Sequence, residues 1–567
     1  MATIIVQPGG PRAGKQRVNL TATAHNRLML LLILFMAITT VLIGRLLWVG
    51  IFAHGAGGDG VLGPFVPARA DIVDRNGVPL ARTMDAYSIA VRPSKLIGDP
   101  DELARKLHDI FPDESESAFR RKLTGRGWAY LRRRALPEQV AAVNALGEIG
   151  IEFPREKERL YPQRTLAAHV LGFAPNSEGA GGMGVEAAFN DRLIDPALRG
   201  KPFAISIDSR VQGALESELY NQMVTQRAKG AGGIILDANT GEVIAMASIP
   251  VFDPNKVQKY AGTRCSDSPL CNHMVQARYE LGSSFKPLSI AAAMDSGVVT
   301  SMAKRYDATA PLAVAGFRIK DDHSLGRWIN VPEILVHSSN IGTARIADEV
   351  GAAPLQRLFR SLDFDQRAPI EFNERAKGIW PSSWGRITTM TVSYGHGIAV
   401  TPLHLATAYA ALVNGGMWRP ATIRKLDADE VPEGRRVFSA ATSARMRQLL
   451  RMIVSAGTGR SADAKGFRVG GKTGSAEKPQ EGRYNKTSLV TTFASAFPMD
   501  NPRYVVVAIM DEATGAFGLR TAAWTAAPVV KRVVERTGPM LGVMPDERRD
   551  VDISDLMPLL HGDKEKE

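Results

Sequence analysis

The sequence predicts an α/β fold of the α+β type: a mostly antiparallel sheet combined with helices, behind an N-terminal domain and a single transmembrane helix. AGGIILDANTGEVIAMAS (231–248) places two apolar runs around an Asn-Thr-Gly turn, which is typical of a β-hairpin. NPRYVVVAIMDE (501–512) predicts a further strand, and TAAWTAAPVVKRVVERT (521–537) predicts a closing helix. Because strands stand at both ends of this region with helical patterns between them, we expect one sheet covered by helices.

Four shorter segments complete the predicted secondary structure. FAISID (203–208) predicts a short strand, and VQGALESELYNQMVTQ (211–226) has helical periodicity. Upstream, DRNG (74–77) predicts a turn and residues 101–110 predict a helix.

The composition is that of an ordinary globular protein, since 45% of the 567 residues are hydrophobic and 23% are charged. The length exceeds what one compact core supports, so we expect two or three domains. A formal charge of +12 would suit nucleic acid, an anionic membrane surface or an acidic polymer outside the cell. The basic residues are spread along the chain and form no compact cluster with aromatic residues, which argues against a nucleic-acid partner.

An apolar segment near the N-terminus predicts a membrane anchor over residues 28–53. Leu28 to Gly44 is uncharged, and after Arg45 the apolar character resumes as far as Ala53. The whole stretch passes the roughly 20 residues that a helix needs to cross a bilayer. Basic residues without acidic ones precede it, so we expect residues 1–27 in the cytoplasm and the bulk of the chain in the periplasm or outside. A cleaved signal peptide is the alternative, although its apolar region is typically about 7–15 residues long.

Changes in composition divide the rest of the chain into three parts. A Gly-rich stretch, HGAGGDGVLGPFV, opens a region that we expect to span residues 54–202. The predicted sheet occupies residues 203–540. The charge-rich end, residues 541–567, predicts a flexible tail.

Two cysteines, Cys265 and Cys271, lie in the polar loop sequence RCSDSPLCN. An oxidising compartment would allow a local disulfide between them, and two free thiols are the alternative. Two sulfur ligands with no second pair nearby argue against a structural zinc site.

Ser-x-x-Lys occurs three times, as Ser283/Lys286, Ser301/Lys304 and Ser475/Lys478. A helix places residues i and i+3 on one face, where a neutral amine could accept the hydroxyl proton if burial or cationic neighbours lower its pKa. Chance supplies such pairs, so the spacing alone does not identify a nucleophile. Around Ser283 and Ser284, in RYELGSSFKP, a helix N-cap is the structural alternative.

Two later motifs favour the first pair. HSSNIG supplies Ser338 and Asn340, although such a sequence also suits a helix cap or turn. VGGKTGSAEK supplies four candidate residues: Lys472, Thr473, Gly474 and Ser475.

The second motif also fits the phosphate-loop pattern G-x-x-x-x-G-K-[ST], through Gly466, Gly471, Lys472 and Thr473. A phosphate loop should follow a buried strand and open a helix. Pro479 lies just beyond, and this sequence opens a helix poorly. Nucleotide is also scarce outside the cell, so we disfavour this reading.

In this order, SxxK, SxN and KTG resemble the motif set of the penicillin-recognising serine enzymes. Nearly the whole chain is similar to class B penicillin-binding proteins. The resemblance is carried by six stretches: ARADIVDRNGVPLA (68–81), RLYPQRTLAAHVLG (159–172), GGMGVEAAFN (181–190, with Glu186 in the expected place), ILDANTGEVIAMASIPVFDPN (235–255), SYGHGIAVTPLHLATAYAALVNGG (393–416) and SAGTGRSADAKGFRVGGKTG (455–474).

Small departures from the family pattern are Ala70 in place of glycine, Leu281 in place of proline and Ser475 in place of threonine. Asn340 and the short basic tail are more similar to the division-specific, FtsI-like branch. The elongation-specific branch, which more often carries Asp in the second motif, is the alternative.

The resemblance implies a transpeptidase fold related to serine β-lactamases, an antiparallel sheet with helices on both sides, behind an elongated pedestal, or dimerisation-like, domain. It also implies a peptidoglycan D,D-transpeptidase that cross-links stem peptides of the septal cell wall and is inhibited covalently by β-lactams. Ser283 would be the acylated nucleophile and Lys286 its favoured base. The three-residue offset to Lys286 favours Ser283 over Ser284.

The remaining roles are also implied by the resemblance. Ser338 would relay a proton, Asn340 would hold the substrate peptide, and Lys472 would place positive charge near Ser338 and the substrate carboxylate. Thr473 and Ser475, flanking Gly474, would bind that carboxylate. Backbone N–H groups of Ser283 and Ser475 would form the oxyanion hole. No metal or organic cofactor is required.

The same resemblance implies an FtsW-like glycosyltransferase of the SEDS family and other divisome membrane proteins as partners, at the septal inner membrane. Two other classes compete with this interpretation. Water as acceptor would give a D,D-carboxypeptidase or a β-lactamase, and a non-catalytic protein would be a penicillin sensor or a scaffold.

Overall fold

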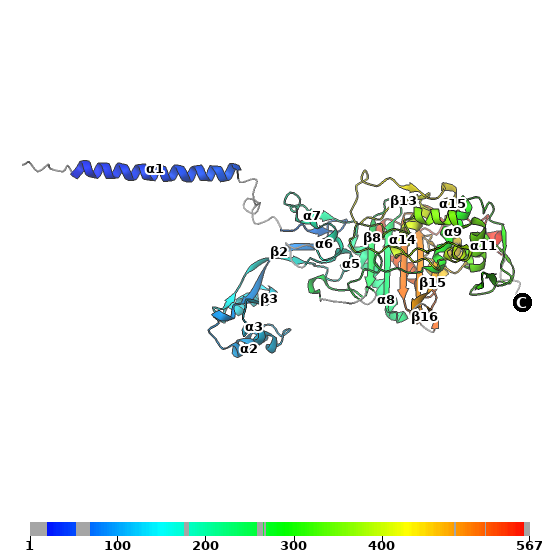
Figure 1. Ribbon diagram of the computed structural model, residues 1–567, viewed down its shortest axis with the longest axis horizontal. Coiled ribbons are helices and arrows are strands. Elements are labelled where there is room, and N and C mark those ends of the chain that lie inside the picture. Colours follow the sequence, from blue (N-terminus) through cyan, green and yellow to red (C-terminus); the bar gives the residue numbers. More distant parts are fainter. Residues whose placement is uncertain are drawn as a thin grey trace, which may run out of the picture. The chain divides into compact units, whose positions relative to one another are not determined.

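The computed structural model describes residues 20–52, 68–174, 181–257, 265, 268–480, 483–515 and 518–560. The chain forms two compact units, Met1–Val66 and Pro67–Glu567. Figure 1 labels their helices and strands.

The described part of the first unit is one helix, α1 (Leu20–Phe52). Its segment from Arg27 to Gly44 has a mean hydropathy of 2.4, and none of it is buried. The helix is therefore long and apolar enough to cross a membrane, in agreement with the predicted anchor. It begins at Leu20, before the apolar run starts at Leu28.

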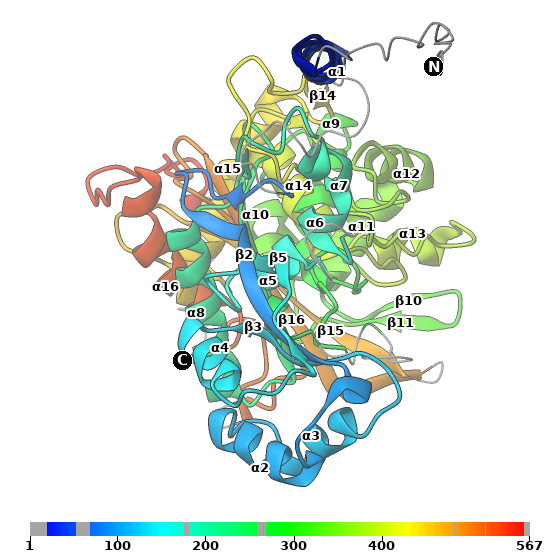
Figure 2. The same ribbon diagram turned by 90° about the vertical axis from the view of Figure 1, so that its left-hand side faces the viewer.

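The N-terminal part of the second unit, which we call the pedestal, contains a six-stranded sheet. Its long strand β2 (Pro79–Val91) pairs antiparallel with β1, β3, β4 and β5. Figure 2 shows α2 (Pro100–Ile110) and α3 (Glu116–Leu123) together at one end of β2. Asp99 and Ser115 cap these two helices through their side chains, so the helix predicted at 101–110 is confirmed.

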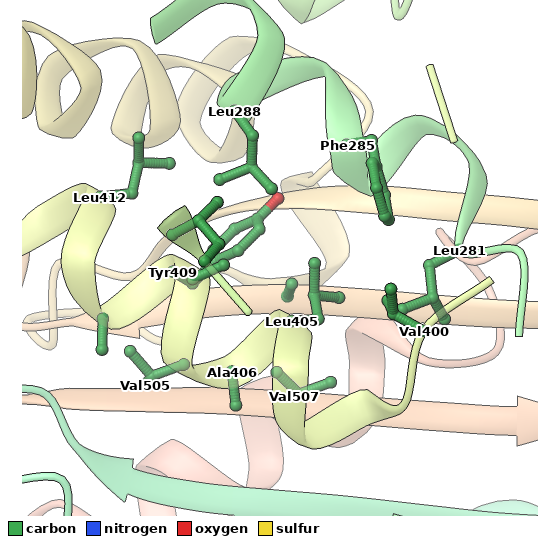
Figure 3. Close-up of a cluster of buried hydrophobic side chains, with 14 of the residues drawn as sticks. Leu281, Phe285, Leu288, Val400, Leu405, Ala406, Tyr409, Leu412, Val505 and Val507 are labelled. Atoms are coloured by element: carbon green, nitrogen blue, oxygen red, sulfur yellow. The ribbon is translucent and has the colours of Figure 1, made fainter. Parts of the chain in front are cut away.

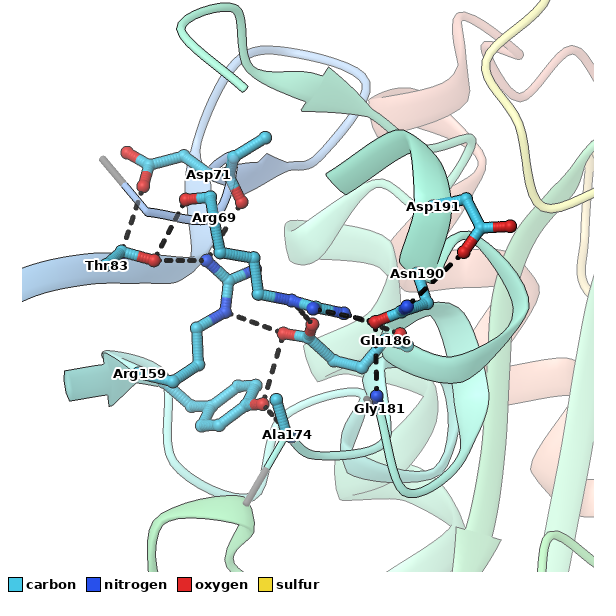
Figure 4. Close-up of polar contacts among 11 residues, drawn as sticks. Arg69, Asp71, Thr83, Arg159, Ala174, Gly181, Glu186, Asn190 and Asp191 are labelled. Atoms are coloured by element: carbon cyan, nitrogen blue, oxygen red, sulfur yellow. Dashed lines mark hydrogen bonds and ion pairs between the residues drawn. The ribbon is translucent and has the colours of Figure 1, made fainter. Parts of the chain in front are cut away.

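A buried ionic cluster joins three separate segments of the pedestal (Figure 4). The Glu186 carboxylate, in α6 (Gly184–Ala188), lies 2.6 Å from Arg69 Nε and 2.7 Å from Arg159 Nε, and all three side chains are 0% exposed. Tyr161 Oη donates to the same carboxylate at 3.1 Å. One carboxylate therefore pairs with two guanidinium groups inside the pedestal, and removing Glu186 would leave both of them without it.

Ala70 lies next to this cluster and is fully buried. Its carbonyl accepts a hydrogen bond from Arg159 Nη1 at 2.9 Å. Its backbone is outside the left-handed region, so alanine fits where the resembling family carries glycine.

The turn predicted at 74–77 connects the pedestal to the C-terminal region. Asp74 Oδ1 accepts from the N–H groups of Asn76 and Val78, which closes the turn. Asp74 Oδ2 accepts from the N–H and hydroxyl of Ser209, the first residue of α8 (Ser209–Gln226). One carboxylate thus holds both a pedestal turn and a helix of the C-terminal region.

The C-terminal region is built on an antiparallel five-stranded sheet, as predicted, in the order β15–β16–β17–β7–β8. The edge strand β15 borders the candidate site. The bounds are β7 (Gly230–Asp237), β8 (Val243–Ile249), β15 (Gly470–Gln480), β16 (Arg483–Phe497) and β17 (Tyr504–Asp511).

Helices cover both faces of this sheet, and alternate residues of β17 pack against opposite layers. Val506 packs into a core with α8 and α16 (Ala527–Thr537), whereas Val505 and Val507 belong to the core on the other face. Figure 3 shows α14 (Pro402–Val413) on that second face, with Tyr409 among the buried side chains. The predicted sheet with helices on both sides is confirmed.

Two predicted elements differ from the structure at their bounds. The strand predicted at 203–208 is reduced to β6 (Phe203–Ala204), which pairs parallel with β1 of the pedestal and not with the main sheet. The helix predicted from residue 521 begins at Ala527, with a proline in its first turn. The hairpin at 231–248 and the strand at 501–512 are confirmed as β7–β8 and β17.

Residues 541–560 correct the expectation of a flexible tail, because they lie against α15 (Ala440–Ala456). Asp550 is 2.7 Å from Arg451 Nη2 and Asp555 is 2.5 Å from Arg445 Nη1. Leu556 is buried. The acidic residues that predicted solvation thus pair with basic residues of the helix. Residues 561–567 lie outside the described part of the chain.

The second unit also contains other helices and strands. The helices include η5 (Gly282–Phe285), α4 (Pro137–Asn144), α5 (Ala168–Leu171), α7 (Asn190–Ile194), α9 (Lys286–Asp295), α10 (Val331–Val336), α11 (Asn340–Val350), α12 (Ala352–Ser361) and α13 (Arg386–Val392). The strands include β1 (Ile72–Val73), β3 (Ala129–Ala135), β4 (Ile151–Glu152), β5 (Arg155–Leu160), β9 (Arg305–Asp307), β10 (Leu312–Val314), β11 (Phe317–Ile319), β12 (Trp328–Asn330), β13 (Met417–Trp418) and β14 (Arg435–Arg436).

Candidate active site

The structure distinguishes the two adjacent serines of η5. Ser283 is half-buried. Ser284 is fully buried, donates its hydroxyl to Leu281 O at 2.8 Å, and accepts a hydrogen bond from Tyr409 Oη at its own carbonyl, also at 2.8 Å. Neither hydroxyl caps α9, so these serines do not form the helix N-cap that was the structural alternative. Ser284 holds the turn in place, which leaves Ser283 as the candidate nucleophile.

Glycines allow β15 to approach this turn. A Cβ on Gly474 would lie 2.3 Å from Leu281 O, and a Cβ on Gly282 would lie 2.8 Å from Ser475 O. Gly282 also has a φ of +53°, which favours glycine. The close approach brings Ser475 beside the Gly282–Ser283 peptide, where two backbone N–H groups could serve one oxyanion.

Two lysines from different elements meet at one hydroxyl. Lys286 Nζ, at the start of α9, lies 3.1 Å from Ser338 Oγ, and Lys472 Nζ, on β15, lies 2.9 Å from the same oxygen. Lys286 Nζ also donates to the Ser338 carbonyl. Both lysines are fully buried. The structure thus brings the SxxK, SxN and KTG motifs together, with Lys286 hydrogen-bonded to Ser338.

Burial changes the acid–base properties of this pair. Burial lowers the pKa of Lys286 to about 7, against the opposing effect of Asp321 and Asp322. Burial and the neighbouring charge of Lys286 also lower the pKa of Lys472. Two ammonium groups around one hydroxyl repel each other, so the pair favours one proton over two. An amine that is neutral near pH 7 suits a general base.

The SxN motif is held by a residue that the sequence did not single out. Asp321 accepts hydrogen bonds from Ser339 Oγ at 2.7 Å, Asn340 N at 2.5 Å and Ile341 N at 3.0 Å. Ser339 is the N-cap of α11. Asp321 belongs to the loop after β11, and no spacing rule connects that loop to the motif, because the contact arises only in the folded chain.

The KTG motif lies on the edge strand β15, and its side chains are held by two more residues that the sequence left out. Thr473 Oγ1 lies 3.1 Å from Thr458 Oγ1, which follows α15. Ser475 Oγ accepts a hydrogen bond from Ala522 N at 3.2 Å. Because β15 is an edge strand, its outer backbone groups could pair with an extended peptide.

A pocket of about 470 Å³ adjoins these residues. Arg278, Tyr279 and Glu280, which precede the η5 turn, line one wall. The residues of β15 that follow Ser475, from Ala476 to Lys478, line another wall. The volume is in the range that accommodates small ligands, and the walls carry both signs of charge.

The other two Ser-x-x-Lys pairs lack this environment. Lys304 Nζ is 2.6 Å from Glu349, and this hydrogen bond raises the pKa of Lys304. Burial alone would lower the pKa of Lys478, but its ion pairs with Asp511 and Glu512 outweigh this effect and raise the pKa. A lysine held in the ammonium form is a poor base, so these pairs are structural.

The phosphate-loop alternative fails on backbone geometry. Lys472 and Thr473 lie within β15, in a strand paired with β16, and do not precede a helix. Among the described residues no group of three or more His, Cys, Asp or Glu side chains is arranged to hold a metal ion.

Cys265 and Cys271 are joined as a disulfide with Cα atoms 5.1 Å apart. Cys265 lines the pocket described above. Cys271 is buried, and its carbonyl accepts a hydrogen bond from Ser248 Oγ at 3.2 Å. Cys265 thus belongs to the wall of the pocket, and among the described contacts neither cysteine touches Ser283, Ser338, Lys286 or Lys472.

Comparisons with known proteins match both parts of the second unit. Residues 231–535 match the family described as the Penicillin binding protein transpeptidase domain, and residues 64–194 match the Penicillin-binding Protein dimerisation domain.

Among curated proteins, the chain is 39% identical over 509 residues to the probable peptidoglycan D,D-transpeptidase FtsI of Caulobacter vibrioides, covering 88% of this chain and 85% of that one. It is 30% identical to the probable peptidoglycan D,D-transpeptidase PenA of Neisseria meningitidis, covering 84% and 85%. The peptidoglycan D,D-transpeptidase FtsI of Escherichia coli is 29% identical, over 78% and 79%.

Among solved structures, the fold is similar to Penicillin binding protein 3 of Mycobacterium tuberculosis, complexed with aztreonam. The TM-score is 0.66 and the identity 24%, covering 85% of this chain and 97% of that one. The similarity therefore extends over the pedestal and the sheet domain alike.

Proposed function

The chain belongs to the penicillin-binding protein transpeptidase family, as a class B, FtsI-like peptidoglycan D,D-transpeptidase, and from this premise we propose which residues carry the reaction. Ser283 is the acylated nucleophile, and Lys286 with Lys472 and Ser338 handles its proton. The observation that supports this assignment is that two buried lysines share the Ser338 hydroxyl, and one of them, Lys286, lies three residues after Ser283.

Acylation begins when Lys286, as the neutral amine, takes the proton of Ser283. Ser283 Oγ attacks the carbonyl of the penultimate D-Ala in a stem pentapeptide, and the tetrahedral intermediate forms. Its collapse breaks the bond to the terminal D-Ala, whose amine receives a proton through Ser338. The acyl group is then an ester of Ser283, and one D-Ala has left.

Transfer reverses these proton movements. The amine of a neighbouring stem peptide attacks the ester carbonyl and gives up a proton to the same lysine and serine groups. The bond to Ser283 Oγ breaks, the serine regains its proton, and a cross-link between two stems remains. The enzyme ends as it began, which makes the reaction ping-pong acyl transfer.

The other site residues bind and orient the substrate. Backbone N–H groups of Ser283 and Ser475 form the oxyanion hole, in which removal of one donor typically costs about 10²–10³ in rate. Thr473 and Ser475 bind the terminal carboxylate, and Asn340 holds the stem. The upstream part of the stem extends along the edge of β15 into the pocket of about 470 Å³. Covalent inhibition by β-lactams follows from the same acylation.

The domain boundaries and the cellular setting complete the proposal. We propose that the region predicted at 54–202 contains the pedestal and that residues 203–540 form the transpeptidase domain; the family matches at 64–194 and 231–535 support this division. The apolar helix α1 anchors the chain in the inner membrane with the catalytic domain in the periplasm. There the protein would act at the division septum with an FtsW-like SEDS glycosyltransferase and other divisome proteins. The disulfide between Cys265 and Cys271 fits an oxidising compartment.

Labelling with a fluorescent penicillin tests the nucleophile. Ser283→Ala should abolish covalent labelling, and Ser284→Ala, the matched control, should retain it. Labelling that persists in Ser283→Ala would refute the assignment. A stem-peptide assay with an added acceptor amine separates the transferase from a hydrolase: cross-linked product is expected, and release of the acyl group to water alone would indicate a carboxypeptidase or β-lactamase.

A further inference from the structure

We propose that Asp321 is a positioning residue of the acylation site, whose carboxylate holds the turn Ser338–Ile341 so that the Ser338 hydroxyl faces both lysines. We call this segment the SSN turn. The inference rests on the proposed function, because it concerns the same serine and lysines, but it assigns a residue outside the three motifs.

The contacts of Asp321 reach the three residues of the SSN turn that follow Ser338. One oxygen, Oδ1, accepts the N–H groups of Asn340 at 2.5 Å and Ile341 at 3.0 Å. The other, Oδ2, accepts the Ser339 hydroxyl at 2.7 Å. Ser339 Oγ in turn accepts Gly342 N at 2.9 Å. Hydrogen bonds to an ionised carboxylate are about twice as strong as neutral ones, so one side chain fixes three consecutive residues.

The same loop also holds the side chain of the motif's amide. Asn340 Nδ2 donates to the carbonyl of Lys320, the residue before Asp321, at 2.9 Å. The loop after β11 therefore orients both the backbone of the SSN turn and the group proposed to hold the substrate.

The SSN turn needs such support because Ser338 has a φ of +61°. A residue other than glycine in the left-handed region is disfavoured by roughly 1–2 kcal/mol, and surrounding contacts must maintain it. In this conformation Ser338 Oγ lies 3.1 Å from Lys286 Nζ and 2.9 Å from Lys472 Nζ. If the SSN turn relaxed, the hydroxyl that joins the two lysines would move.

The charge of Asp321 adds a second effect, which a purely structural residue would lack. The charged groups near Lys286 are Lys472 from β15, whose pKa the charge of Lys286 lowers, and the carboxylates of Asp321 and Asp322. The carboxylates favour the ammonium form and so raise the pKa of Lys286 against the effect of burial. Removing either charge should let Lys286 lose its proton at lower pH.

Asp322 provides the matched control. Its side chain is exposed, and among the described residues it makes no hydrogen bond to the SSN turn. Asp322→Asn therefore removes a neighbouring charge without removing a contact of the turn. Asp321→Ala removes charge and contacts together. Asp321→Asn removes the charge but keeps an oxygen for the two N–H groups, while its amide can donate to Ser339 Oγ.

The experiment measures the second-order rate constant for acylation of the full-length protein by a fluorescent penicillin between pH 5.5 and 9. For Asp321→Ala we expect a plateau at high pH that is about 10- to 100-fold below wild type, since small displacements of a catalytic group have effects of this size. For Asp321→Asn we expect a fall of roughly 3- to 10-fold, because charged hydrogen bonds become neutral. Asp322→Asn should keep the wild-type plateau. All three variants should move the acid limb to lower pH.

Two results would overturn the proposal. One is a plateau within twofold of wild type in the Asp321 variants. The other is a lowered plateau with an unmoved acid limb, which would indicate general loosening of the fold. If Asp321→Ala does not fold, as judged by thermal unfolding, Asp321→Asn alone decides between these outcomes. Failure of the proposed function is distinguishable, because the wild-type protein would then not be labelled at Ser283 at all.

Discussion

Two buried clusters of charged side chains in this protein follow opposite rules. In the pedestal, Glu186 lies between Arg69 and Arg159, and all three side chains are 0% exposed. In the catalytic site, Lys286 and Lys472 are equally buried but carry the same sign and share only a hydroxyl. The oppositely charged side chains form ion pairs that join three chain segments. Burial lowers the pKa values of both lysines, the charge of Lys286 lowers that of Lys472 further, and Lys286 is the proposed base.

The first prediction breaks the like-charged cluster and has the largest expected effect. Lys286→Met should reduce acylation by penicillin by about 10²- to 10⁴-fold, the range typical of general-base catalysis. The side chain of methionine fills a similar volume, so folding should persist. Rapid labelling kinetics check the rate, and labelling at the wild-type rate would show that Lys286 is not the base.

The same variant has a pH-dependent signature in stability. Burial lowers the pKa of Lys286 to about 7, whereas an unfolded lysine titrates near about 10.4. Between these values the unfolded chain binds the extra proton, so the unfolding free energy of the wild type rises with pH. Lys286→Met should therefore stabilise the protein most at pH 6, with a gain that shrinks towards pH 10. Thermal unfolding at both pH values measures it, and a gain independent of pH would contradict the assigned pKa.

The second prediction disrupts the buried cluster of Glu186, Arg69 and Arg159 in the pedestal. Glu186→Gln leaves two buried guanidinium groups without their carboxylate, which should lower the unfolding free energy by about 3–5 kcal/mol. Folded protein should still be acylated, because the cluster touches no catalytic residue. Chemical denaturation measures the loss, with Lys286→Met as the contrasting variant. An unchanged midpoint would mean that the cluster is not what holds the pedestal segments.

The third prediction uses a partly exposed ion pair and has the smallest expected effect. Asp550 pairs with Arg451, which also contacts Asp463 at 2.8 Å. Because Asp550 is partly solvated and Arg451 keeps a second carboxylate, Asp550→Asn should cost no more than about 1 kcal/mol. Denaturation midpoints check this. A loss of stability as large as that of Glu186→Gln would show that burial does not determine how much an ion pair contributes to the unfolding free energy.

The sequence predicted those parts of the site that local motifs encode. Lys286 lies three residues after Ser283, a spacing that a helix places on one face, so spacing made this pair one of three candidates. Ser338 and Lys472 could be joined to it only through the family resemblance, since 134 positions separate them from each other. Their meeting at one hydroxyl depends on the packing of β15 against η5.

What the sequence did not predict are contacts made by tertiary structure. Asp321 and Thr458 lie in loops whose positions depend on β11 and α15, and neither belongs to a spacing pattern. The charges of residues 541–560 suggested solvation, because their partners Arg445 and Arg451 lie on a helix about a hundred positions earlier. The strand at 203–208 was shortened because its partner, β1, belongs to the pedestal. Periodicity identifies an element, whereas its partner is fixed only by the fold.

The pH dependence of wild-type acylation tests the central claim, that burial lowers the pKa of Lys286 and so makes it a base for Ser283. The second-order rate constant for a fluorescent penicillin should rise from pH 5.5 to a plateau with a midpoint near the pKa of about 7, and peptide mapping should place the adduct on Ser283. A rate that does not change across this range, or an adduct on another residue, would contradict the account.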